Sequence, residues 1–128
     1  MSTTIYDKLV SEMPPSLDKA MLRVMSYHGG RDHSIGGESL VAALFRQGYH
    51  VEKRQMRQCV HDLRRAGYLI CSAPGEDGGY YMAETLAEFR EFCDRELHPK
   101  AMDLLETESA MKEAARQLFG DAVQEAML

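Results

Sequence analysis

The sequence predicts a mainly helical chain with one small β-hairpin, and three observations lead to this fold class. Apolar residues recur at helical spacing in three stretches between residues 17 and 66. A glycine-rich turn over residues 73–79 then separates two short β-prone segments. Helical spacing returns from residue 84 onward. At 128 residues the chain is long enough to bury one ordinary core with appendages.

The first 15 residues predict a short helical arm. Apolar residues recur at helical spacing over residues 5–13, and two consecutive prolines then end the pattern. Ser16 is a good N-cap for the helix that follows, which extends to Gly29. The apolar stripe of that helix consists of Leu17, Ala20, Met21, Val24 and Met25. A domain is therefore expected to begin at residue 16.

Two further helices are expected after a loop over residues 29–37, which is rich in Gly, Asp and Ser. The second helix is marked by Leu40, Val41, Leu44 and Phe45. It ends near Gly48. The third helix, over residues 52–66, stops at Gly67. Its inward residues are Met56, Cys59, Val60 and Leu63.

A hairpin follows the third helix, with Tyr68–Cys71 and Tyr80–Met82 as its strands. Side chains alternate along a strand, so one of Tyr80 and Tyr81 should cover the helices while the other faces outward. Three helices followed by a hairpin make a winged helix-turn-helix. The expected domain therefore spans residues 16–83.

Residues 84–128 are expected to form C-terminal helices, interrupted at Pro99. Leu104, Met111 and Leu118 are spaced by seven residues, with Glu108 between them in a short heptad-like order. We expect these helices to form a homodimer. The alternative is that they fold back over the core of their own chain.

Positive charge is concentrated in one stretch, although the net charge of the chain is −5. Residues 46–65 carry six basic and two acidic side chains, whereas residues 84–128 carry five and eleven. On a helical wheel, the basic residues of the third helix fall on the face opposite its apolar residues. Arginine and glutamine on such a face suit the major groove of double-stranded DNA, and flanking cations suit phosphates. The expected DNA-binding residues are Lys53, Arg54, Arg57, Gln58, His61, Arg64 and Arg65. A solvated basic face on an ordinary surface helix is the alternative.

A family resemblance supports this interpretation over about residues 17–83. Three segments resemble the winged helix-turn-helix proteins of bacterial and phage regulators, especially the group that includes the biotin repressor N-terminal domain and the type 11 helix-turn-helix domains. The segments are Val51-Glu-Lys-Arg-Gln-Met-Arg-Gln-Cys-Val-His-Asp-Leu-Arg-Arg-Ala-Gly67, Ile70-Cys-Ser and Gly78-Gly-Tyr-Tyr-Met82. The resemblance implies that Arg54 and Arg57 lie on a recognition helix and that Gly78 and Gly79 belong to the wing. Two departures are a longer connection over residues 45–51 and an acidic wing tip at residues 76–77.

Several function classes find no support in the sequence. Three cysteines without CxxC spacing argue against a disulfide framework or a zinc knuckle, and His28 and His33 lack further ligands at a recognisable spacing. No nucleophile–base set or phosphate loop can be assembled, so neither an enzyme nor a cofactor is expected. No apolar run is long enough for a membrane span, and a cytoplasmic protein is expected. We expect a sequence-specific DNA-binding regulator of transcription or of a phage or prophage. The alternative is a protein–protein interaction module that does not bind DNA.

Overall fold

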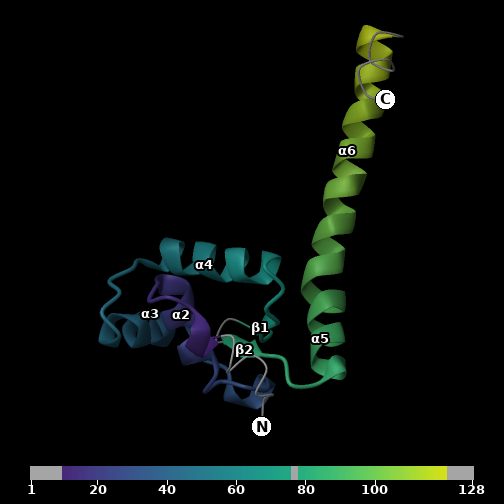
Figure 1. The fold of residues 1–128 in the computed structure, drawn as a ribbon. Coiled ribbons are helices and arrows are strands. Elements are labelled where there is room, and N and C mark those ends of the chain that lie inside the picture. The colour runs from purple at the N-terminus through teal and green to yellow at the C-terminus, as the bar shows by residue number, and fades with distance from the viewer. Residues whose placement is uncertain (1–9, 76–77, 121–128) are drawn as a thin grey trace. The chain divides into compact units, whose positions relative to one another are not determined.

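The computed structural model describes residues 10–75 and 78–120, and it is mainly helical with a two-stranded antiparallel hairpin, as expected (Figure 1). The chain divides after Phe92 into two compact units, each described by itself below. The elements of the first unit are α2 (Leu17–Met25), a 3-10 turn η1 (Arg31–His33), α3 (Gly37–Arg46), α4 (Lys53–Arg65), β1 (Ile70–Ser72), β2 (Tyr80–Met82) and α5 (Leu86–Phe92). Those of the second are a π-helical turn η2 (Cys93–Leu97) and α6 (His98–Phe119).

Helices α2, α3 and α4 pack against one another around the main core of the first unit (Figure 1). The Ser16 side chain caps α2 by accepting a hydrogen bond from the Lys19 backbone N–H at 3.1 Å, as the sequence predicted. Of the predicted arm, residues 1–9 lie outside the described residues. Residues 10–12 are helical, and Val10 and Met13 pack against the core.

Helix α4 begins one residue later than expected, and its N-terminus is fixed by the backbone N–H of Glu52, which donates to Gln55 Oε1 at 2.8 Å. Gly48 and Gly67 have positive φ angles of 91° and 99°, so they end α3 and α4 as predicted. The inward face of α4 also matches the prediction. Its buried residues are Met56, Cys59, Val60 and Leu63.

The segment expected to be a loop, residues 29–37, contributes a third backbone partner to the hairpin. Ile35 and Tyr80 exchange backbone hydrogen bonds of 2.8 Å in both directions, and the Gly30 N–H donates to the Met82 carbonyl at 2.9 Å. Gly79 allows this approach, because a Cβ atom there would overlap the Ile35 carbonyl. The sequence pattern does not indicate this pairing, because residues 29–37 form a segment too short and too rich in glycine to resemble a strand.

Both faces of the hairpin are covered, which corrects the expectation that one tyrosine ring faces outward. Tyr80 packs on the three-helix core, while Tyr81 is completely buried in a second cluster with Cys71 and Phe92. Phe92 comes from α5 and is only 3% exposed. The first unit therefore extends to Phe92, beyond the boundary expected after residue 83.

In the second unit, α6 is a helix of 22 residues with no buried side chain. Pro99 lies in its first turn, where the missing N–H costs nothing. The expected interruption at Pro99 is therefore a π-helical turn over Cys93–Leu97 rather than a break in the helix. None of the described helices is both long and apolar enough to span a bilayer.

Candidate nucleic-acid interface

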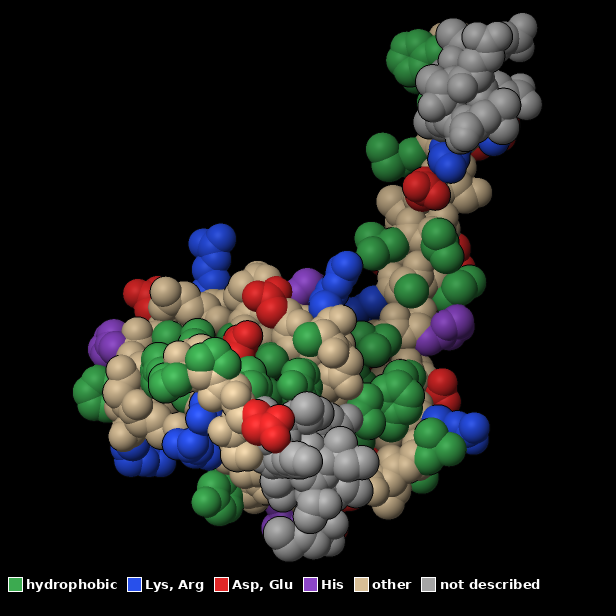
Figure 2. Space-filling model, in the orientation of Figure 1, with side chains coloured by type: hydrophobic (Ala, Val, Ile, Leu, Met, Phe, Trp, Pro, Cys, Tyr) green, Lys and Arg blue, Asp and Glu red, His purple; other side chains and the backbone are tan. Residues whose placement is uncertain are grey.

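Helix α4 presents a polar face to solvent, and this face contains six of the seven residues expected to bind DNA. They are Lys53, Arg54, Arg57, Gln58, His61 and Arg65, and each is exposed. Figure 2 shows Lys or Arg side chains rising from the edge that α4 forms, with acidic and His side chains among them. Because the opposite face of α4 is anchored in the core, the exposed side chains start from a rigid backbone.

The arginines of this face are available to a ligand. Arg54, Arg57 and Arg65 form no salt bridge with any residue in 10–75 or 78–120. Lys53 Nζ lies 3.3 Å from Glu38 Oε1, but the Glu38 side chain is 86% exposed. An ion pair this exposed contributes at most about 1 kcal/mol, so a phosphate can replace the carboxylate.

Asp62 contacts two of the polar side chains of the face, Gln58 and His61. Gln58 Nε2 donates to Asp62 Oδ1 at 2.9 Å, and His61 Nδ1 lies 3.5 Å from the same oxygen. The Asp62 carboxylate therefore restrains the orientation of the Gln58 amide, which lies one helical turn earlier in α4. It also lowers the positive potential of the middle of the helix.

Arg64 is the seventh expected residue, and its side chain turns toward the hairpin. Its Nε donates to the Ile70 carbonyl at 2.7 Å, and the guanidinium carbon lies 4.9 Å from the centre of the Phe92 ring. The Tyr80 ring is 6.0 Å away. These contacts join α4 to the hairpin and to α5, so we leave Arg64 out of the candidate interface. The helical wheel could not reveal this role, because Phe92 is distant in the sequence.

Cys59 lies on the buried face and connects α4 to α2. Its Sγ donates to Asp18 Oδ1 at 3.3 Å. Burial, helped by this carboxylate, raises the pKa of the Cys59 thiol from 9.0 to about 12. The thiol is therefore protonated at neutral pH and acts as a small core residue with a weak donor, not as a nucleophile. The sequence placed Cys59 inward but gave no sign of Asp18 as its partner.

The acidic wing tip at residues 76–77 lies outside the described residues. The connection between α3 and α4 is described, and it includes an edge-on contact between the Phe45 and His50 rings, with centroids 5.5 Å apart. Phe45 itself is 60% exposed.

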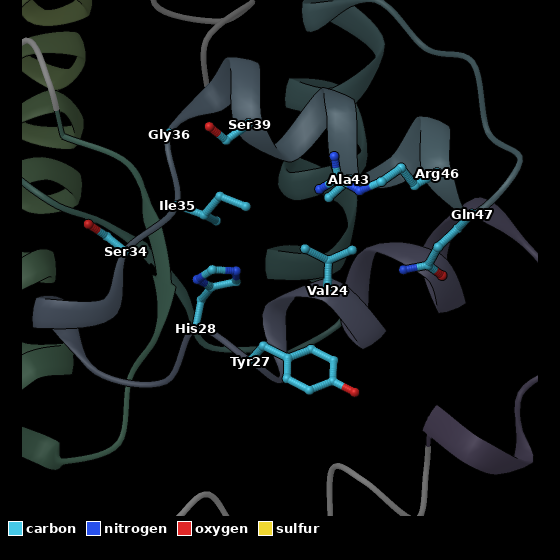
Figure 3. Close-up of a pocket in the computed structure, with 10 residues that line it drawn as sticks. All are labelled: Val24, Tyr27, His28, Ser34, Ile35, Gly36, Ser39, Ala43, Arg46 and Gln47. Carbon is cyan, nitrogen blue, oxygen red and sulfur yellow. The ribbon is translucent and has the colours of Figure 1, made fainter.

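The first unit also has an open groove of about 580 Å³ on the side of α2 and α3 (Figure 3). The side chains of Val24, His28 and Ile35 point toward one another across it, and Arg46 lies at its rim. His28 Nδ1 is 2.8 Å from the His33 carbonyl oxygen, which occupies one ring nitrogen. No group of three or more His, Cys, Asp or Glu side chains within residues 10–75 and 78–120 is arranged to hold a metal ion. The groove therefore offers a less specific arrangement than the α4 face.

Comparison with known proteins gives no match from which a function could be assigned, so the assignment rests on the α4 face. No protein-family model, curated protein sequence or solved structure matches the chain.

Proposed function

We propose that the protein is a winged-helix DNA-binding regulator that inserts α4 into the major groove of double-stranded DNA. The observation that carries the proposal is the α4 face itself. Three arginines without salt bridges in the described part of the chain lie together with Lys53 on one side of a 13-residue helix, and the other side of that helix is buried. The groove of B-DNA admits a helix of this size.

The arrangement of the first unit supports the same proposal. Three packed helices precede a hairpin, and the segment around Ile35 adds a third strand-like partner to β2. This is the element order of a winged helix, in which the third helix enters the groove. The hydrogen bond from Arg64 to the Ile70 carbonyl fixes the hairpin against the end of that helix.

The side chains of α4 suit different parts of DNA. Arg57 and Gln58 lie in the middle of the exposed face, where a guanidinium can pair with guanine and an amide with adenine. Arg54, His61 and Arg65 are exposed on the same face. In this proposal they also enter the groove, and Lys53 at the start of the helix contacts a phosphate. Lys53 and Arg65 are separated by about 18 Å along the helix axis, at 1.5 Å per residue. The face therefore spans several base pairs.

A salt titration tests the proposal. If the four exposed cations of α4 each displace a counterion from pooled mixed-sequence duplexes, affinity should fall roughly 150-fold between about 50 mM and about 200 mM salt. The Lys53/Arg54/Arg57→Ala variant retains one of these cations, so its affinity should fall only about 3-fold to 4-fold over the same range. A matched control removes three exposed cations elsewhere: Arg23/Arg90/Lys100→Ala. The control should retain the steep salt dependence of the unmodified chain.

A protein-interaction module is the second candidate, and the charge of the chain favours it. Residues 84–128 carry eleven acidic against five basic side chains, which disfavours contact with a phosphate backbone. If the chain does not bind DNA at 50 mM salt, or if both triple variants behave alike, the α4 face is not a DNA reader. Either outcome would favour the interaction module.

A further inference from the structure

Helix α6 exposes large apolar side chains along one side, which a lone helix in water does not favour. Leu104, Met111 and Leu118 are 69%, 68% and 77% exposed. Leu105 and Phe119 beside them are 57% and 67% exposed. Figure 2 shows hydrophobic side chains standing out along α6. A contiguous exposed stripe of this length marks an interaction surface.

The stripe has a heptad order with a regular alternation of size. At successive spacings of three and four residues, its positions are Ala101, Leu104, Glu108, Met111, Ala115 and Leu118. One set of seam positions therefore carries two alanines and a glutamate, and the other set carries only Leu and Met. This alternation restricts which partner helix can fill the seam.

We propose that α6 pairs with α6 of a second copy of this chain, and that the two helices run antiparallel. In an antiparallel pair, each position of one set faces a position of the other set. Ala101 then faces Leu118 of the partner subunit, and Leu104 faces Ala115 of the partner subunit. Each of these layers combines one small and one large side chain, which fills the seam evenly. The second copy is therefore an occupant whose shape matches the stripe along its whole length.

A parallel pair of the same helices would be poorly packed. Each alanine would face its own copy and leave a gap, and Glu108 would face Glu108 of the partner subunit. In the antiparallel pair, Glu108 faces Met111 of the partner subunit instead. Within its own chain, Glu108 Oε1 lies 3.5 Å from Lys112 Nζ, so each seam carboxylate brings its own counter-charge. Charge and size thus favour the same orientation.

The flanking side chains widen the contact in this orientation. Leu105 faces Lys112 of the partner subunit, whose aliphatic stem can cover it. The first residues of the two α6 helices would lie about 35 Å apart along the pair, from about 23 steps of 1.5 Å in this register. The dimer itself does not depend on DNA binding.

Sedimentation of the full chain without DNA tests the interface. The unmodified chain should sediment as a dimer at micromolar concentration, and Leu104→Lys/Met111→Lys should weaken association by at least about 100-fold. The control Met102→Lys/Ala110→Lys adds the same two charges outside the stripe and should remain dimeric. Glu108→Leu should tighten the dimer by about tenfold or more, which a merely misfolded variant would not do. A chain that is monomeric, or a dimer that the stripe variant leaves intact, overturns the proposal.

Disulfide trapping tests the orientation, in a Cys93→Ser background so that the remaining native cysteines, Cys59 and Cys71, are buried. Ala101→Cys and Leu118→Cys chains are oxidised separately and then as a mixture. The antiparallel pair predicts disulfides only in the mixture, between one chain of each kind. Disulfides within either separate sample would indicate parallel helices and overturn the proposed orientation.

Discussion

Alanine substitution of two neighbouring arginines at the end of α4, Arg64 and Arg65, should affect different properties of the protein. The Arg64 guanidinium donates to the Ile70 carbonyl at 2.7 Å and lies over the Phe92 ring, whereas Arg65 is exposed and forms no salt bridge among the described residues. Arg64→Ala should therefore destabilise the first unit with little effect on the DNA-binding face. Arg65→Ala should weaken DNA binding with little effect on stability.

The size of the stability effect follows from the contacts. A hydrogen bond from a charged group contributes about 1.5–3 kcal/mol, and a cation–π contact contributes about 0.5–2 kcal/mol. Because Arg64 is half-buried, we expect a loss of about 2–3 kcal/mol on substitution by Ala. For a unit of this size, this loss lowers Tm by about 10–20 °C. Arg65→Ala, at an exposed position, should change stability by less than about 0.5 kcal/mol.

The assay is thermal and urea unfolding followed by near-UV circular dichroism. All six tyrosines precede residue 93 and the chain has no tryptophan, so the tyrosine band of this signal reports on the first unit. On DNA, Arg65→Ala should reduce the slope of log affinity against log salt by about 0.9, while Arg64→Ala should leave it unchanged below the Tm of that variant. These roles of Arg64 and Arg65 are wrong if Arg64→Ala is neutral for stability, or if the two variants lose the same salt dependence.

Four further predictions concern the hairpin and the core. Gly79→Ala should lower stability by more than about 2 kcal/mol in urea unfolding, because its Cβ would separate the hairpin from its third segment. Gly36→Ala, which meets nothing within 4 Å, is the control, and equal effects would contradict the close approach. Phe92→Ala should cost about 3–5 kcal/mol in the same assay, and a loss below 1 kcal/mol would show that α5 does not cover the hairpin. Cys59 should react with iodoacetamide at pH 8 about 1000-fold more slowly in the folded than in the urea-unfolded protein, by peptide mass spectrometry, while the partly exposed Cys93 reacts readily. Since folding raises the Cys59 pKa, stability should fall as the pH rises from about 9 toward about 12. Cys59→Ala should show a shallower fall over this range, and equal profiles for the two proteins would contradict the shift.

The sequence alone determined the features that depend on neighbours along the chain. The N-cap at Ser16, the glycines that end α3 and α4, and the inward face of α4 all agree with the structure. Each of these follows from helical periodicity or from the backbone freedom of one residue, and both are visible within a few positions. The exposure of six candidate DNA-binding side chains follows from the same periodicity.

Only the tertiary structure decided the features that depend on distant partners. It paired Ile35 with Tyr80, placed Phe92 over Tyr81, and turned Arg64 away from the exposed face of α4. The helical wheel places Arg64 at the edge of the polar face, and an arginine there can point outward or inward. Its direction was set by the Ile70 carbonyl at the start of β1 and by the Phe92 ring from α5. Those groups come near Arg64 only when the chain folds, because sequence spacing does not fix contacts between separate elements.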